Sequence, residues 1–373
     1  MAGYSSQINK LLLILIFGLF VFFIWMDVNL YIRIQDFPIR STEIRLLNGS
    51  VAYMSTQPPT KPSATFSSPY PRAAGRYEDV AWVSCDLNPL CEVTVKAMIL
   101  DHPNHYLFAP MVTIADDLSG ISKGDLITPN MISFFHVFVA IAAARMINSN
   151  SLRNRRIGVV LFEFRTFLDD LDGHVARDKK HTHGERSDIG SVGFYIDGTC
   201  DALGVLALMA GIYFFFENYP PRGVYKQLQP IIPITKPKFM ESSIAFIGDL
   251  ARKEVVQKIL CFGAIWALSA IGWCRHIDIY QDLLDRENVA PAQFLRQVSV
   301  FRSTGFFIIC WLWRIFNLHA LLHFLLLSIF CDKLWEFLRL IQYTGFVAIA
   351  IVIGVTEIHL HRIKNLIFNS STD

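Results

Sequence analysis

Five aspartates stand in two short stretches of an otherwise apolar part of the chain, and four of them are spaced so that they can share helix faces: Asp169, Asp172, Asp197 and Asp201. They occur in the sequences DDLDGHVAR, which begins at Asp169, and GFYIDGTCD, which ends at Asp201. On a helix, Asp169 and Asp172 share a face because they are three positions apart, and Asp197 and Asp201 share one because they are four apart. Two antiparallel helices joined by a short loop would bring the two carboxylate faces together. The spacing therefore predicts one site built from two neighbouring helices.

Such a site suits divalent metal ions and phosphoryl transfer. An ionised side chain at membrane depth costs about 2.5–3.5 kcal/mol on insertion scales, so four uncompensated carboxylates in one place would be hard to tolerate. Two divalent cations would balance their charge, and carboxylate oxygens suit Mg²⁺ or Mn²⁺. Two such ions can clamp a phosphoryl group while it is transferred. Gly173 and Ala176 leave a small-residue surface beside the carboxylates, and Arg177 is placed to neutralise a diphosphate.

A purely structural role for the aspartates is the alternative. They could reach the membrane surface from helix ends, or pair with Lys179, Lys180 and Arg186. Pairing of this kind accounts for one or two carboxylates. It does not account for the small residues beside all four, on two neighbouring segments, so metal-dependent chemistry is the stronger interpretation.

The elements that must position these residues are apolar segments. The chain has 373 residues, of which 53% are hydrophobic and 30 are phenylalanine. Backbone groups in lipid are satisfied only within helices or closed barrels, so these segments are predicted to be helices. Thr128 is placed to cap the first of them, with Pro129 in its first turn. The six segments lie at 130–147, 157–176, 189–216, 256–273, 304–330 and 338–357.

Charge and cysteine usage exclude other classes of protein. The net charge of +2 gives no electrostatic support to nucleic-acid binding, so no nucleic-acid partner is expected. The seven cysteines include no CxxC pair, which argues against a structural zinc site.

A further apolar run, 11–26, lies near the N-terminus. No small-residue cleavage site follows it, which favours an uncleaved membrane anchor over a secretory signal peptide. The region 27–125 is polar and contains a Pro/Ser-rich linker. Asn48 begins a glycosylation sequon, and Cys85 and Cys91 are close enough to pair, although reduced and buried cysteines are equally compatible. These features favour a location outside the cytosol for this region.

The predicted fold class is an all-α integral membrane protein, with a six-helix core and one N-terminal transmembrane anchor. The predicted domains are the anchor at 1–26, a polar lumenal region at 27–125, a catalytic membrane domain at 126–364 and a C-terminal tail at 365–373.

The two aspartate stretches together resemble the signature of the CDP-alcohol phosphotransferase family. That signature is D-x2-D-G-x2-A-R, a spacer, and G-x3-D-x3-D, and every fixed position is matched. The sequence ITPNMIS, which ends at Ser133, also resembles the start of the family's first core helix. The resemblance covers residues 126–364. It implies a six-helix membrane core that transfers a phospho-headgroup from a CDP-linked donor to a lipid hydroxyl.

The resemblance also implies a role for each matched residue. Asp169, Asp172 and Asp197 would be metal ligands. Asp201 would belong to the metal site and act as the general base that deprotonates the acceptor hydroxyl. Homodimers are common in the family. The CDP pocket would be lined by Gly173, Ala176, Arg177 and Gly193.

Two features depart from typical members of the family. The spacer between Arg177 and Gly193 has fifteen residues and is longer than usual; we interpret the extra sequence as a longer loop, with contact to the headgroup as the alternative. The N-terminal anchor is the second departure. If the N-terminus stays in the cytosol, this additional helix inverts the core, so that the aspartates face the lumen. The lysines and arginines of the loops are too evenly divided to fix the orientation. The sequon and the cysteine pair favour an active site in the lumen.

These departures resemble the branch of the family that transfers phosphoethanolamine from CDP-ethanolamine to ceramide in the Golgi membrane, using Mn²⁺. The alternative within the family is an ethanolamine- or choline-phosphotransferase acting on diacylglycerol, in the endoplasmic reticulum membrane. An ion-coupled transporter is the alternative from a different class, but no internal repeat is visible to favour it. Arg314 is interpreted as the partner of a carboxylate in the bundle, and the histidines as interhelical hydrogen-bond partners; contact of Arg314 or Glu163 with substrate is the alternative. The polar residues left out of the catalytic set are Glu163, Arg165, Arg314, Asn317, His319 and His323.

Overall fold

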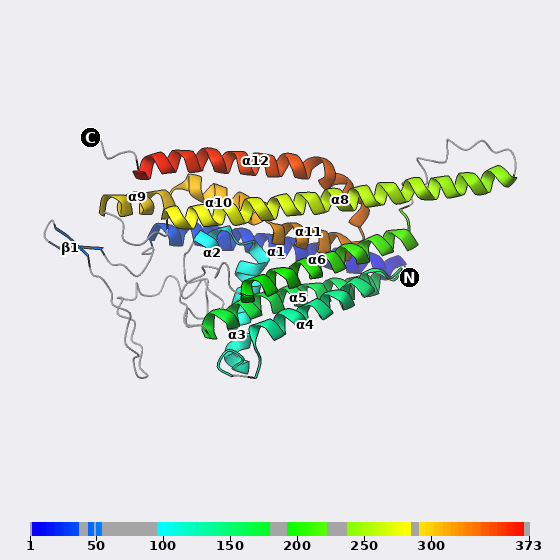
Figure 1. Cartoon of the computed structure of the whole chain (residues 1–373), viewed down its shortest axis with the longest axis horizontal. Helices are drawn as coiled ribbons and strands as arrows, with labels where there is room; N and C mark the ends of the chain where they lie inside the picture. Colours follow the sequence, from blue (N-terminus) through cyan, green and yellow to red (C-terminus); the bar gives the residue numbers. More distant parts are fainter. Residues whose placement is uncertain are drawn as a thin grey trace. The chain divides into compact units, whose positions relative to one another are not determined.

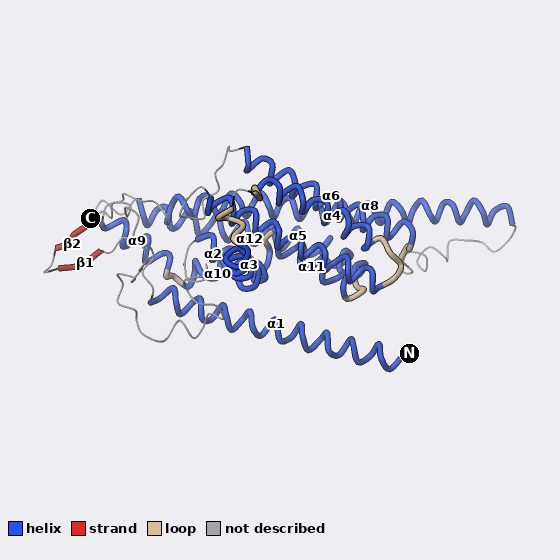
Figure 2. The backbone as a smooth tube through the Cα atoms, turned by 90° about the horizontal axis from the view of Figure 1, so that it is seen from below, coloured by secondary structure: helices blue, strands red, loops and turns tan. Residues whose placement is uncertain are grey.

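The computed structural model describes residues 2–36, 44–47, 50–53, 95–124, 126–179, 192–221, 237–284 and 291–368. Figure 2 shows that the described chain is almost entirely helical. The exception is a short antiparallel hairpin formed by β1 (Ile44–Leu47) and β2 (Ser50–Tyr53). Asn48 of the sequon, Cys85 and Cys91, and residues 180–191 of the long spacer lie outside the described residues.

In the part of the chain that the structure describes, the apolar segments predicted from the sequence lie in helices. Within the described residues, α1, α4, α6, α8 and α12 are each long and apolar enough to cross a membrane, and α9 with α10, bent by 52°, would make a sixth span if counted together. The predicted class, an all-α membrane protein, is therefore confirmed. The helices are α1 (Ala2–Asp36), α2 (Val95–Ile99), the π-helix η2 (Asn104–Phe108), α3 (Ala109–Ser119), α4 (Pro129–Ile147), α5 (Leu152–Lys179), α6 (Val192–Asn218), α8 (Pro237–Leu284), α9 (Pro291–Phe301), α10 (Thr304–Phe316), α11 (Leu318–Phe330) and α12 (Leu334–Phe368).

These helices form two compact units. The first unit comprises Met1–Pro110, Arg275–Arg314 and Val355–Asp373, and the second comprises Met111–Cys274 and Ile315–Gly354. The domain boundaries expected from the sequence stay predictions.

The second unit is built around α4, which packs along both α5 and α6 (Figure 1). Thr128 caps α4 by accepting a hydrogen bond from the backbone N–H of Met131, and Pro129 occupies the first turn, as predicted. Two glycines permit the close approach of the helices. A Cβ at Gly158 would lie 2.8 Å from the Ala143 carbonyl oxygen, and one at Gly211 would lie 2.7 Å from that of Ala144.

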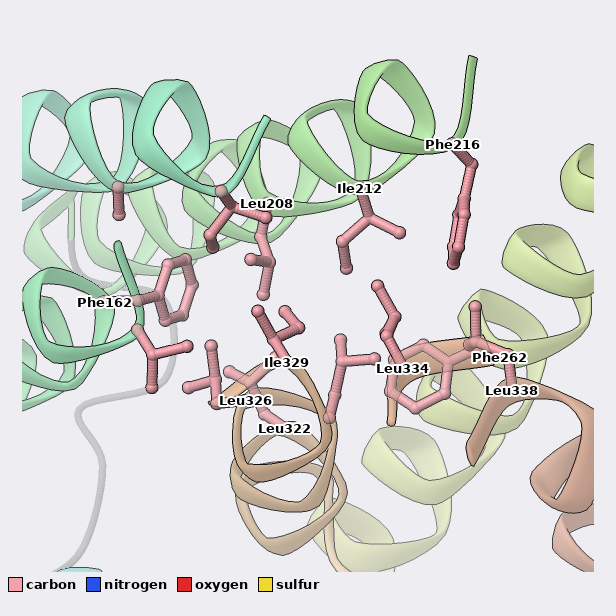
Figure 3. Packing of buried hydrophobic residues seen from close by; sticks show 14 of the residues in the cluster. Phe162, Leu208, Ile212, Phe216, Phe262, Leu322, Leu326, Ile329, Leu334 and Leu338 are labelled. Carbon is pink, nitrogen blue, oxygen red and sulfur yellow. The ribbon is translucent and has the colours of Figure 1, made fainter. Parts of the chain in front are cut away.

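A large apolar cluster holds the second unit together. Figure 3 shows Phe162, Leu208 and Ile329 among the side chains that meet there, contributed by α5, α6 and α11. α11 also packs directly against α5. The carboxylate-bearing stretches of α5 and α6 are therefore extensions of helices that are fixed elsewhere by buried apolar contacts.

The segment 304–330, expected to be one helix, is divided into α10 and α11. The side chain of Asn317 caps α11 by accepting a 2.7 Å hydrogen bond from the backbone N–H of Ala320. The carbonyls at the break have their own donors: Ser269 Oγ donates to Phe316, and Trp266 Nε1 donates to Leu318. Asn317, which lies within an apolar segment of the sequence, therefore separates α10 from α11 and caps α11.

In the first unit, α1 carries a buried aspartate with several polar partners. Tyr106 donates to Asp27 at 2.6 Å, Trp311 donates to it at 3.0 Å, and the His102 ring nitrogen lies 2.8 Å from it. The guanidinium of Arg314 lies 3.6 Å from the same carboxylate and 4.6 Å from the ring centre of Tyr106. This confirms the interpretation of Arg314 as a residue paired with a carboxylate inside the bundle.

Candidate active site

The four predicted aspartates come from the two helices that the sequence indicated. Asp169 and Asp172 lie on α5, while Asp197 and Asp201 lie on α6. The side chain of Asp172 is only 2% exposed and that of Asp169 12%, whereas that of Asp201 is 37% exposed. Of these three carboxylates, that of Asp201 is therefore the most open to an incoming group.

A third helix, α4, completes the site with a histidine and a serine. His136 is fully buried, and its Nε2 lies 3.6 Å from an oxygen of Asp169 and 3.9 Å from oxygens of both Asp172 and Asp201. Ser133 lies one turn earlier and donates a 2.6 Å hydrogen bond to Asp172. Because α4 packs along both α5 and α6, one of its faces covers the carboxylate cluster.

Arg165 joins the two carboxylate-bearing helices. Its guanidinium lies 3.5 Å from Asp169 on its own helix and pairs closely with Asp201 on α6. The side chain is almost completely buried, and the absence of a side chain at Gly204 makes room for it: a Cβ there would lie 3.1 Å from the Arg165 Nε. The arginine supplies one positive charge among the carboxylates.

The donor set fits a divalent metal ion. One ligand atom each from His136, Asp169, Asp172 and Asp197 lies within 4.8 Å of all the others. Neither ring nitrogen of His136 has a hydrogen-bond partner among the described residues, and the same holds for Oδ1 of Asp169. Ligands about 2.1 Å from an octahedral ion would lie roughly 3.0 to 4.2 Å apart, so the histidine–carboxylate distances suit a shared ion. Besides the grouping of ligand atoms, these buried atoms without hydrogen-bond partners also indicate a ligand site.

The residues predicted to line a CDP pocket also lie on these helices. Gly173, Ala176 and Arg177 follow Asp172 on α5, and Gly193 is in the first turn of α6. The Arg177 side chain folds back along α5 over Gly173, where a Cβ would lie 3.2 Å from its Nη1. Nucleotide binding by these four residues stays a prediction.

The loop before α4 is fixed against the end of α5. Asp116 of α3 accepts a 2.8 Å hydrogen bond from the backbone N–H of Ser122 and lies 3.2 Å from His174 Nε2. Burial opposes the ionisation of Asp116, but the hydrogen bonds from Ser122 and the neighbouring His174 outweigh it and lower the pKa of the carboxyl. Lys179 donates to the carbonyls of Gly124 and Ile127, each at 2.7 Å. These contacts set the position of α4 against the carboxylate-bearing end of α5.

Sequence reasoning missed two of the residues around the carboxylates. His136 was not singled out, and Arg165 was noted as an intramembrane charge but left out of the catalytic set. The spacing of Ser133 and His136, three residues apart just after the helix start, could have indicated a polar face on α4. His323 of α11 does have an interhelical partner as predicted, since its Nδ1 lies 3.1 Å from the carboxylate of Glu163 on α5.

A membrane-embedded helical bundle with a carboxylate cluster where three helices meet is the architecture expected of a transferase that acts on lipids. The ceramide phosphoethanolamine synthase family matches residues 1–370. The chain is 48% identical over 391 residues to the ceramide phosphoethanolamine synthase of Drosophila melanogaster, covering 100% of this chain and 98% of that protein. No solved structure matches this chain. The chain belongs to the ceramide phosphoethanolamine synthase family and is a multi-pass membrane transferase.

Proposed function

We propose that this protein transfers phosphoethanolamine from CDP-ethanolamine to the primary hydroxyl of ceramide. The ceramide oxygen forms a bond to the phosphorus that carries ethanolamine, and the bond from that phosphorus to the CMP oxygen breaks. The hydroxyl proton passes to the enzyme, and the products are ceramide phosphoethanolamine and CMP. Membership of the family and the name of the Drosophila relative support this choice of donor and acceptor.

The observation that carries the proposal is the meeting of all four signature carboxylates at the α4 face that holds His136. Asp169, Asp172, Asp197 and Asp201 would hold two divalent ions, Mn²⁺ or Mg²⁺. When bound, such ions would neutralise the diphosphate of the donor and the charge that develops on the transferring group. The buried ligand atoms without hydrogen-bond partners support metal binding at this place.

Asp201 is proposed as the general base. Its side chain is more exposed than those of Asp169 and Asp172, so an acceptor hydroxyl can approach it. Its close pairing with Arg165 holds the carboxylate in position for that approach. The deeper carboxylates of Asp169 and Asp172 are better suited to hold metal.

Gly173, Ala176, Arg177 and Gly193 are proposed to form the CDP pocket. The first three continue the carboxylate-bearing face of α5, so a nucleotide diphosphate bound to metal at Asp172 would extend along them. Arg177 would add positive charge beside the diphosphate.

We further propose that the enzyme resides in the Golgi membrane, as a homodimer, with its active site open to the lumen. In sealed Golgi vesicles with this orientation, CDP-ethanolamine added outside gives product only after it enters the lumen, so detergent should raise the rate. Equal rates before and after permeabilisation would indicate a cytosolic active site.

A donor and acceptor panel tests the reaction. Purified enzyme in detergent with Mn²⁺ would be offered CDP-ethanolamine or CDP-choline together with ceramide or diacylglycerol, and CMP release would be measured. We expect CMP only from CDP-ethanolamine with ceramide. Product from diacylglycerol would be compatible with the proposed phosphoethanolamine transfer but would contradict ceramide as the acceptor.

Asp201→Asn is the matched variant for the general base. It keeps the size and shape of the side chain but cannot accept a proton, and we expect kcat to fall about 10²- to 10⁴-fold. The thermal midpoint of the variant would be measured in parallel. If the variant folds and its kcat is unchanged, Asp201 is not the general base.

A further inference from the structure

His136 is a buried histidine whose ring is directed at the carboxylate cluster. It is fully buried, and both ring nitrogens lack a hydrogen-bond partner among the residues that the structure describes. A buried polar atom without a hydrogen-bond partner is destabilising, so the two ring nitrogens of His136 indicate a site for a ligand. Its Nε2 lies within 3.9 Å of oxygens from three of the signature aspartates, too far for hydrogen bonds and close enough to share an ion with them.

The chemistry of imidazole decides which ion such a donor set prefers. Mg²⁺ is a hard ion that proteins bind through oxygen, and it gives up its water ligands reluctantly. Imidazole nitrogen is a ligand of transition metals, while carboxylate oxygens suit both Mg²⁺ and Mn²⁺. Adding one imidazole to a set of carboxylates therefore costs Mg²⁺ more than it costs Mn²⁺.

We propose that His136 is a direct nitrogen ligand of the active-site metal and that it makes this site select Mn²⁺ over Mg²⁺. The inference rests on the proposed metal-dependent function and adds a residue of α4 to a ligand set otherwise drawn from α5 and α6. Asp169, Asp172 and Asp197 supply the oxygen ligands of the same ion.

The competing interpretation makes His136 a positively charged counter-ion. In that case the protonated ring would pair with the surrounding carboxylates and could not ligate metal through Nε2. The two arrangements differ in one measurable quantity, the magnetic coupling between bound Mn²⁺ and a histidine nitrogen.

Pulsed electron paramagnetic resonance of the wild-type protein loaded with Mn²⁺ and CMP measures that coupling directly. We expect modulation from a directly bound nitrogen, and we expect it to change when histidine alone is labelled with ¹⁵N. The label assigns the coupling to protein histidine and excludes the cytosine nitrogens. Because this experiment uses the wild-type chain, it does not depend on whether any variant folds.

The variant His136→Gln replaces the ring nitrogen with an amide oxygen at a similar reach. We expect it to lose the nitrogen coupling, and we expect the ratio of the Mg²⁺ to the Mn²⁺ dissociation constant to fall about tenfold or more. That ratio is obtained by displacing bound Mn²⁺ with Mg²⁺ and recording the signal of free Mn²⁺. The matched control is His323→Gln, which removes the histidine beside Glu163 in the same unit and should keep both the coupling and the ratio.

The outcomes separate this inference from the proposed function. Bound Mn²⁺ without histidine-nitrogen coupling would overturn the role of His136 and leave the carboxylate metal site intact. Failure to bind Mn²⁺ at all, with CMP present, would overturn the metal-dependent function itself. Loss of coupling in His323→Gln would indicate that the bound nitrogen belongs to His323 of α11 and not to His136 of α4, which would also overturn the inference.

Discussion

The charge of the active site is set by a small number of ionisable side chains. When ionised, the four signature aspartates and Arg165 together carry a formal charge of −3, with the guanidinium bridging α5 and α6 through Asp169 and Asp201. Two divalent ions and the diphosphate of a CDP-linked donor would bring that total close to neutrality. Arg165 thus lowers the repulsion among the carboxylates without occupying the positions of the metal ligands.

Replacing Arg165 should impair turnover more than substrate binding. We expect Arg165→Gln to lower kcat about 10²-fold or more, with a much smaller change in KM for CDP-ethanolamine. The reason is that Asp201 would lose the guanidinium that orients its carboxylate. Arg165→Lys keeps the positive charge without the forked geometry and should retain intermediate activity. Initial rates of the three proteins, measured at saturating Mn²⁺, provide the check.

A purely structural role for Arg165 predicts a different result. Both variants would then show lower thermal midpoints, while the kcat of the folded fraction would match that of the wild type. Equal activity of the Lys and Gln variants would also contradict the positioning role.

At the residue scale, the convergence of the four aspartates could be predicted from the sequence, but the position of His136 beside them and the contact of Arg165 with Asp201 could not. The spacing of the aspartates along α5 and α6 follows from helix periodicity, so their convergence could be expected. The contact of His136 with the carboxylates depends on how α4 packs, which no short-range pattern encodes. Arg165 is one turn before Asp169 and could be placed beside it, but its contact with Asp201 depends on the space left by Gly204.

The packing of α4 against its neighbours determines where these side chains meet. Gly158 of α5 and Gly211 of α6 both face α4, and each would bring an added Cβ within 3 Å of an α4 backbone oxygen. Small residues of this kind allow membrane helices to approach closely, where packing forces between them act. A shift of α4 would move Ser133 and His136 away from the carboxylates.

Gly211→Ala should separate α4 from α6 and destabilise the second unit. The new Cβ would meet the backbone of Ala144, which cannot rotate away, and overpacking of this kind typically costs about 1–3 kcal/mol. We expect a lower thermal midpoint in detergent. Gly198→Ala is the control on the same helix, because nothing lies within 4 Å of its added Cβ.

Since alanine favours a helix over glycine by up to about 1 kcal/mol, the control should keep or raise the midpoint. Equal midpoints for the two variants would mean that the contact between α4 and α6 is looser than the structure indicates.

The elements themselves were largely predictable from the sequence. The capped start of α4 followed from Thr128 and Pro129, and the long apolar helices followed from composition. The division at Asn317 was not predicted, because its cap depends on Ser269 and Trp266 of α8 as donors to the freed carbonyls. The short helices between residues 95 and 119 also escaped prediction, since apolar and polar residues mix there without a clear period.

At the scale of the whole molecule, the N-terminal helix is more than a membrane anchor. Asp27 of α1 is buried with Tyr106, His102, Trp311 and Arg314, so α1 is tied within the first unit to η2 and α10. Charged groups at membrane depth are retained when they have partners of this kind. The predicted anchor therefore contributes directly to the packing of the first unit.

Asp27 and Arg314 should be energetically coupled. We expect Asp27→Asn and Arg314→Met each to lower the thermal midpoint, because each leaves a buried charge without its opposite partner. The double variant should cost less than the sum of the single ones, with a coupling of about 0.5–3 kcal/mol. Thermal unfolding of the four proteins in one detergent gives this cycle, and simple additivity would contradict the pairing.

Two of the partners of Asp27, Trp311 and Arg314, are synthesised long after Asp27 itself. Asp27 and Trp311 are 284 residues apart in the chain. At roughly 5–20 residues per second, a ribosome needs about 15 to 60 s to reach α10 after completing α1. His102 and Tyr106 are made early in that interval, but the guanidinium partner of Asp27 is not. A nascent chain that stops before Arg314 would display the acid without its arginine to the machinery that removes incomplete membrane proteins. We expect chains stalled just before Arg314 to be degraded faster than chains stalled beyond it, and Asp27→Asn to abolish the difference.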